Sequence, residues 1–327
     1  MINTIKFISE SFFRLLLLLI GVSILSFILI IHSPIDPVDA YVGAESNVSA
    51  QQRENIARHW GLDKSPVVRY TTWVKNMLQG DMGTSIIYQK PVSKVLLERF
   101  QTSLILMVTA WVLSGIIGFV LGVLAGSGQG TWYDKAIKAV CFVLSSTPVF
   151  WIGLLLLMVF SISFGWFPIG LAAPIGKAAQ DVTIWDRIYH LILPAITLSI
   201  TGIANITLHT RQKLIDVLSS DYVLFAKARG ESKWTLVKRH GIRNIAIPAV
   251  TLQFASFSEL FGGSVLAEQV FSYPGLGNAA TQAGLKGDVP LLLGVALFSA
   301  VFVFAGNLSA NILYGVFNPQ IREGSKV

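Results

Sequence analysis

Charged side chains are scarce in this sequence. Only 13% of its 327 residues are Asp, Glu, Lys or Arg, whereas 53% are hydrophobic and the mean hydropathy is +0.63. Soluble globular domains carry about a quarter of their residues as charged side chains. The composition therefore excludes an ordinary soluble domain. It predicts an all-α, polytopic membrane protein.

Residues that would support metal or redox chemistry are also few. The single cysteine, Cys141, excludes an intrachain disulfide, and its place in an apolar run predicts a buried, inert thiol. No dense cluster of His, Cys or Met marks a path for a bare metal ion, so we expect neither a bound metal nor a cofactor in this chain.

Several catalytic motifs are missing from the sequence. It contains no His-Glu-x-x-His, no Gly-x-Ser-x-Gly and no Gly-x-x-x-x-Gly-Lys-Ser/Thr loop, and Gly287-Asp288 lacks the preceding glycine that aspartyl intramembrane proteases use. We therefore expect neither an enzyme nor a nucleotide-binding site. A channel or an intramembrane enzyme without a recognised motif is the alternative function.

Six apolar runs have about the 20 residues needed to cross a hydrocarbon core of roughly 30 Å. They cover residues 12–31, 102–126, 139–164, 191–210, 246–269 and 289–314. The first run is longer than the apolar part of a signal peptide and precedes no small-residue cleavage site, so we interpret it as an uncleaved anchor. These runs predict a bundle of six transmembrane helices.

Two spans carry packing signals. Gly115, Gly118 and Gly122 recur every three or four residues in the second span, which predicts a seam for a neighbouring helix. Pro148 predicts a kink in the third span, where the hydroxyl groups of residues 145–147 can satisfy freed carbonyl groups. That kink lines a pathway or only shapes the packing.

A polar segment, residues 32–101, follows the first span. Ser49 and Gln52 have the spacing of a capping box, and Gly61 would end that helix. A second short helix begins at Ser65-Pro66, carries Trp73 and Met77 on one face, and ends at Gly80. The cluster Gly80-Asp81-x-Gly83 has two interpretations, a turn or a metal site, and turn chemistry is favoured.

A basic insert separates the fourth and fifth spans. Between Arg211 and Arg243 it holds eight Lys or Arg residues against three Asp or Glu residues. Side-chain oxygens of Ser219, Ser220 and Asp221 can cap a first helix, which Gly230 would end in a left-handed conformation.

A second short helix is expected from Ser232 to near Gly241. Its apolar residues Trp234, Leu236 and Val237 either dock on another protein or pack on their own chain.

The distribution of positive charge predicts the orientation. Segments expected inside hold fourteen Lys and Arg residues, and the two short outer loops hold three. Positive charge marks the cytoplasmic side, so both termini are expected there in a cell (inner or cytoplasmic) membrane. The net charge of +7 is thereby explained without nucleic-acid binding.

Three groups of residues resemble a known family. They are Ala226-Lys227-Ala228-Arg229-Gly230 with Arg239-His240 and Arg243-Asn244; Leu78-x-Gly80-Asp81-x-Gly83-x-Ser85; and Glu268, Phe271 and Pro274-Gly275-x-Gly277. Together they are similar to permease subunits of ABC importers of the dipeptide, oligopeptide and nickel group. Of the general Glu-Ala-Ala loop pattern, only Ala226 and Gly230 are present.

The resemblance implies a type I importer permease that moves small peptides, nickel or metal chelates by alternating access. Its implied partners are a homologous second permease subunit, two ABC ATPase subunits that hydrolyse ATP, and an extracytoplasmic substrate-binding protein. The residues that would couple it to the ATPase are Ala226, Arg229, Gly230, Trp234, Leu236, Val237, His240 and Arg243.

One ionisable residue lies within the fifth span. Glu259 would be costly in lipid, so it is expected to face protein or a watery cavity. With Gln253 and Ser256 it could form a polar strip along the translocation path. The alternative is a role in packing against the partner permease.

The expected organisation is linear. Residues 1–31 form the N-terminal segment and first span, 32–101 an extracytoplasmic segment, 102–317 a five-helix core with the cytoplasmic coupling loop 211–245, and 318–327 a cytoplasmic tail.

Overall fold

The computed structural model describes residues 2–33, 38, 49–59, 63–178 and 180–317. Its helices, in chain order, are α1 (Ile2–Ile31), α3 (Ala50–His59), α4 (Pro66–Leu78), α5 (Val92–Ser127), α6 (Trp132–Ser146), α7 (Val149–Leu156), the π-helical η1 (Leu157–Ser163), α8 (Ile184–Leu218), α9 (Asp221–Ala228), α10 (Lys233–Leu236), the π-helical η2 (Val237–Gly241), α11 (Ile242–Ala255), α12 (Phe257–Val270), α13 (Leu276–Leu285) and α14 (Val289–Phe317). The expected C-terminal tail and the helix stop at Gly61 lie outside the described residues.

Long apolar helices confirm the all-α membrane fold. Within the described residues, four helices could each cross a membrane, and the number rises to six if each of two bent pairs is one span. The six expected spans correspond to α1, α5, α6 with α7 and η1, α8, α11 with α12, and α14. Several helices extend beyond the apolar runs that predicted them: α8, for example, begins at Ile184 because Thr183 and Asp186 form a capping box.

The chain forms two compact units that do not follow the linear division expected from the sequence. One unit comprises residues 1–103 and 274–305, and the other comprises 104–273 and 306–327. The expected boundary at residues 101 and 102 falls inside α5, because this helix is continuous from Val92. Residues 211–218 of the expected coupling loop likewise belong to α8.

The third span is broken more sharply than a proline kink. Its two halves meet at a bend of 108° at Thr147-Pro148. The carbonyl that has no donor at Pro148 is that of Leu144, four residues earlier, and it accepts from Thr147 N at 3.4 Å. Thr147 Oγ1 in turn donates to the Val143 carbonyl at 2.7 Å, which Thr147 N would bond in a regular helix, and Ser145 Oγ donates to the Phe142 carbonyl at 3.1 Å.

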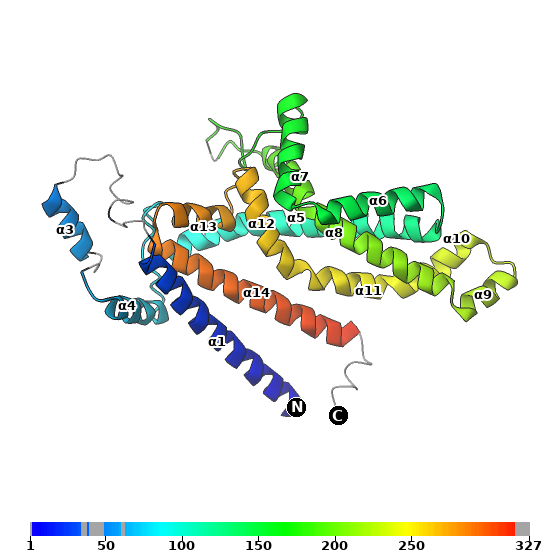
Figure 1. The fold of residues 1–327 in the computed structure, drawn as a ribbon, viewed down its shortest axis with the longest axis horizontal. Helices are drawn as coiled ribbons and strands as arrows, with labels where there is room; N and C mark the ends of the chain where they lie inside the picture. The colour runs from blue at the N-terminus through cyan, green and yellow to red at the C-terminus, as the bar shows by residue number, and fades with distance from the viewer. Residues whose placement is uncertain (1, 34–37, 39–48, 60–62, 179, 318–327) are drawn as a thin grey trace. The chain divides into compact units, whose positions relative to one another are not determined.

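The glycine seam of α5 is confirmed in the second unit, where α8 lies between α6 and α11 (Figure 1). A Cβ on Gly118 would lie 2.9 Å from Ile206 Cβ, and one on Gly122 would lie 2.6 Å from Thr210 Cβ. Both distances are shorter than side chains tolerate, so α5 and α8 approach this closely only because these positions are glycine.

In the first unit, a buried carboxylate holds the segment of residues 79–91. Asp288 is fully buried and accepts from Ser85 Oγ at 2.5 Å, Ile87 N at 3.0 Å and Leu291 N at 3.2 Å. Asp81, by contrast, is exposed and, among the described residues, accepts only from Gly83 N at 2.8 Å. Gly80 and Gly83 have φ of +87° and +83°. The turn interpretation of Asp81 is confirmed.

The Pro-Gly-x-Gly segment is held in the same unit. Arg99 Nη1 donates to the Pro274 carbonyl at 3.2 Å, and Leu276 N donates to Ser103 Oγ at 2.7 Å at the start of α13. Ser103 and Leu276 are both fully buried. These two bonds attach the start of α13 to α5.

The capping box at Ser49 is confirmed. Its backbone N donates to Gln52 Oε1 at 3.2 Å, and Gln52 N donates to Ser49 Oγ at 3.3 Å. Helix α4 also begins at Pro66 as expected, with Ser65 at its N-cap.

Candidate functional site

The first candidate site is the coupling segment, which we define as residues 219–241, between α8 and α11. Figure 1 shows α9 and α10 at one end of these two long helices. Helix α9 ends at Ala228, Gly230 has φ of +90°, and α10 begins at Lys233. The left-handed turn expected at Gly230 is therefore confirmed, and no heavy atom lies within 4 Å of the place where its Cβ would be.

The first helix of the segment is not capped as the sequence predicts. Ser220 Oγ donates back to the Val217 carbonyl at 2.5 Å, and Ser219 Oγ donates to the Ile215 carbonyl at 3.0 Å. The expected N-cap contribution of these two serines is wrong, because their hydroxyl groups satisfy the free carbonyls at the end of α8 instead. Ser232 does cap α10, since its Oγ accepts from Thr235 N at 3.3 Å.

The second helix does not end near Gly241, as expected, but runs through η2 directly into α11. Gly241 is buried, and a Cβ there would lie 2.6 Å from Leu214 Cδ1 of α8. The glycine therefore permits close packing on α8 rather than a helix stop. As a result, the coupling segment is joined rigidly to the fifth span.

The apolar residues of the coupling segment fall into two groups. Leu236 packs with Val223 and Ala226, and Val237 packs with Val123, Leu214 and Ile245. Leu236 and Val237 thus follow the alternative in which they pack on their own chain, and Ala226 is buried with them.

Trp234 behaves differently. Its side chain is 61% exposed, and on α9 Phe225, Tyr222 and Leu224 are 67%, 51% and 49% exposed. We call these four residues the apolar surface. Arg229 is exposed too, whereas Ala226 is buried.

Polar contacts join α9 and the turn that follows it to η2 and the start of α11. Glu231 lies 3.5 Å from His240 Nε2 and 3.8 Å from Arg239 Nη1. Asn244 Nδ2 donates to the His240 carbonyl at 2.6 Å and to the Tyr222 hydroxyl at 3.3 Å. His240 is therefore half-buried inside the segment.

Arg243 is exposed. Sequence reasoning gave Glu231 and Asn244 no role, although Asn244 belongs to a motif that it quoted.

A second feature that sequence reasoning missed is a buried ion pair. Arg211 Nε lies 2.5 Å from Asp134 Oδ1 and its Nη2 lies 2.9 Å from Asp134 Oδ2, which also accepts from Gly130 N at 2.9 Å. Arg211 was counted only as one of the positive charges of the insert. The pair links the start of α6 to α8. Removing either partner would leave an uncompensated buried charge.

The second candidate site is the polar strip of the fifth span, which bends by 51° at Ser256. Gln253 is buried against α5, where its Nε2 donates to the Trp111 carbonyl at 2.5 Å and to Ser114 Oγ at 3.2 Å. Ser256 Oγ donates to the Gln253 carbonyl at 3.0 Å, while Glu259 is exposed in the first turn of α12. The structure does not bring the side chains of Gln253 and Glu259 together.

No group of three or more His, Cys, Asp or Glu in the described part of the chain could hold a metal ion. The candidate sites are thus an apolar surface on a rigid segment and an isolated carboxylate in a bent span.

Comparison with known proteins gives matches along the whole chain. The family described as "Binding-protein-dependent transport system inner membrane component" matches residues 118–323, and the family of the N-terminal part of these membrane components matches residues 4–107.

Three relatives illustrate the similarity. An oligopeptide transport system permease protein of Bacillus subtilis is 36% identical over 93% of this chain and 95% of its own length. A di/tripeptide transport system permease protein of Pseudomonas aeruginosa is 34% identical over 97% and 99%. A glutathione transport system permease protein of Escherichia coli is 34% identical over 92% and 94%.

Proposed function

The chain belongs to the family of binding-protein-dependent transport system inner membrane components, and from this premise we propose that it is the permease subunit of an ABC importer that carries small peptides across the membrane. The observation that supports this function best is the apolar surface of the coupling segment, which is held rigidly on the ends of two membrane helices.

The proposed cargo follows from the relatives. The three relatives described above match this chain over nearly their whole length, and they are named for oligopeptides, for di- and tripeptides and for glutathione. All three names describe peptides, which favours a peptide over nickel or a metal chelate. The absence of a dense His, Cys or Met cluster in the sequence agrees with an organic cargo.

The coupling segment is proposed to bind a partner ATPase. The coupling segment exposes four large apolar side chains within thirteen residues, and exposed apolar surface is a mark of a binding site for protein or membrane. Leu236 and Val237 pack α9 and α10 against α8 and thereby fix the position of this surface. Ala226 and Gly230 shape it, Arg229 and Arg243 supply positive charge around it, and His240 lies against Glu231 inside the segment.

Rigid attachment explains how such a surface would transmit force. Movement of a docked ATPase would act on η2, and η2 continues without interruption into α11. A bound partner can shift the balance between two states of the membrane helices if it binds one state better. In this proposal ATP is hydrolysed by the partners, and the permease alternates access to its central path.

The further partners that we propose are a second ATPase subunit, a homologous second permease subunit and a substrate-binding protein. The family's name already ties its members to a binding protein. We propose that the coupling segment and both termini lie on the cytoplasmic side, which the excess of Lys and Arg in that segment supports. A cysteine at Ser232 should then resist an impermeant thiol reagent added to intact cells, and its labelling would overturn this orientation.

Trp234→Asp tests the docking role. A charge in the apolar surface should release the ATPase subunits from the purified permease and abolish peptide uptake, because a buried charge without a partner is costly. Trp185→Asp is the matched control: Trp185 is 74% exposed, outside the coupling segment. It should leave the ATPases bound. Copurification of the ATPases with Trp234→Asp at the wild-type level would contradict the proposal.

A further inference from the structure

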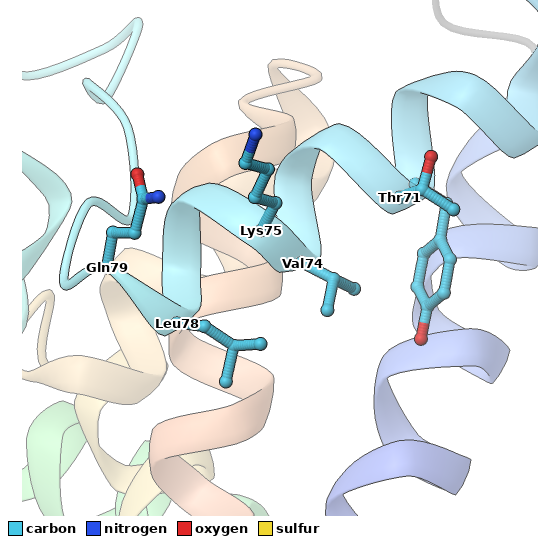
Figure 2. Close-up of a pocket in the computed structure, with 6 residues that line it drawn as sticks. Thr71, Val74, Lys75, Leu78 and Gln79 are labelled. Atoms are coloured by element: carbon cyan, nitrogen blue, oxygen red, sulfur yellow. The ribbon is translucent and has the colours of Figure 1, made fainter.

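Helix α4 is amphipathic, although it lies in a segment that the sequence assigns to the aqueous side. At helical spacing, one arc carries the apolar side chains and the other the polar ones, except that Val68 falls on the polar arc. The apolar arc holds Val67, Tyr70, Trp73, Val74, Met77 and Leu78, and the polar arc holds Arg69, Thr72, Lys75, Asn76 and Gln79. Figure 2 shows Val74 and Leu78 on one side of the helix and Lys75 and Gln79 on the other.

The apolar arc is covered only in part within the first unit, where Tyr70, Trp73, Val74 and Met77 are half-buried. Leu78 is 79% exposed and Val67 is 72% exposed, and no residue of α4 is buried. A hollow of about 360 Å³ lies along this helix and is lined by Tyr70, Thr71, Val74, Lys75, Leu78 and Gln79 (Figure 2).

Contacts with α1 place α4 at the depth of the membrane. The Tyr70 hydroxyl is 2.8 Å from Ser23 Oγ, and its ring centroid is 5.2 Å from that of Phe27. Both α1 residues lie inside the span Glu10–Ile31. Ser23 precedes the end of this span by eight residues, which is about 12 Å along a helix. The tyrosine side chain therefore reaches below the membrane surface.

The charges of α4 favour one kind of neighbour. The helix contains Arg69 and Lys75 and has no acidic residue between Pro66 and Leu78. Helices that lie in a membrane interface combine an apolar face with basic residues on the polar face. Basic residues next to the membrane attract the phosphate of anionic lipid headgroups.

We propose that α4 lies in the membrane interface at the Ile31 end of α1 and that its apolar arc binds phospholipid, with acyl chains against Val74 and Leu78 and the headgroup near Lys75. The contact between Tyr70 and Ser23 sets the depth of the helix. This inference requires that α1 spans the bilayer, and it does not depend on the cargo or on the coupling segment.

Two labelled variants test the proposal. Leu78→Cys and Asn76→Cys place an environment-sensitive fluorophore on opposite arcs of the same helix. The native Cys141 is 3% exposed, so it should stay unlabelled, which unmodified protein checks directly. The labelled permease, assembled with its ATPase partners, is reconstituted in phosphatidylglycerol-containing nanodiscs. Quenching is measured with lipids brominated on the acyl chain and with aqueous iodide.

The label at Leu78 should be quenched severalfold more by brominated lipid than the label at Asn76, and iodide should show the reverse order. Equal quenching of both labels by iodide would show a water-exposed helix and overturn the proposal. Protection of the Leu78 label from both quenchers would show that protein covers the apolar arc, and this result also overturns it.

Discussion

Two connecting segments differ in how fully contacts within their own unit occupy their side chains. Residues 79–91 in the first unit are held by contacts within that unit, because Asp288 accepts three hydrogen bonds from this segment and from the start of α14. The coupling segment in the second unit has one side that packs on its own chain and one side that is exposed. Val223 and Leu236 pack on α8, whereas Phe225 and Trp234 are more than half exposed.

The difference indicates what each segment is for. A buried carboxylate with three donors fixes one conformation, because any rearrangement would leave polar groups without partners. An exposed apolar surface on a firm base marks a binding site for protein or membrane. The first segment is complete within the described chain, and the second is the one that we propose to bind a partner ATPase.

Removing the buried carboxylate should produce the largest effect. Asp288→Ala would leave Ser85 Oγ, Ile87 N and Leu291 N without an acceptor, at about 1–3 kcal/mol for each buried group. We expect a marked fall in the thermal unfolding temperature of the purified permease and loss of uptake. Asp81→Ala removes one exposed acceptor and should cost under about 1 kcal/mol. Equal unfolding temperatures for the two variants would show that segment 79–91 is not held by Asp288.

A smaller effect is expected at Gly230, where the coupling segment turns. Valine at φ of +90° should cost about 1–2 kcal/mol, because L residues are strained there. Gly176 offers a matched control, with φ of +86° and equally open space. Gly230→Val and Gly176→Val should lower stability similarly, but only Gly230→Val should uncouple ATP hydrolysis from uptake. Uncoupling by both variants would attribute the effect to instability alone.

Local signals predicted much of this structure. Apolar length predicted the spans, the spacing of Gly118 and Gly122 predicted close contact with a neighbouring helix, and Gly230 predicted the left-handed turn. These features are encoded within a few consecutive residues. The sequence also identified Trp234 as a candidate surface residue. It could not predict that Trp234 is exposed and Leu236 buried, because burial depends on which face of the helix meets α8.

Long-range polar contacts escaped prediction. Ser85 and Asp288 are separated by more than 200 positions, and Asp134 and Arg211 by 77. A lone Asp or Arg carries no local mark of its distant partner. Gly241 was misjudged for a related reason: a glycine that ends a helix and one that admits a neighbour look alike in sequence.

Glu259 extends the comparison to a third carboxylate, whose surroundings differ from those of the buried Asp288. It is exposed in α12, and none of the described residues provides a hydrogen bond to its side chain. A charge within a membrane span costs roughly 2.5–3.5 kcal/mol unless it faces water or protein. We therefore expect it to face either the translocation path or the second permease subunit.

Glu259→Gln separates these two roles because it keeps the size of the side chain and removes its charge. If Glu259 lines the path, uptake of peptides with a free amino terminus and a lysine should fall by severalfold, while expression, assembly and basal ATP hydrolysis persist. Asp181→Asn, at an exposed carboxylate just before α8, should change none of these measurements. Uptake at the wild-type rate would remove Glu259 from the path, whereas loss of the second permease subunit on purification would assign it to the subunit contact. Because Glu259 is exposed in the described part of the chain, a defect limited to cationic peptides would be an effect of charge rather than of folding.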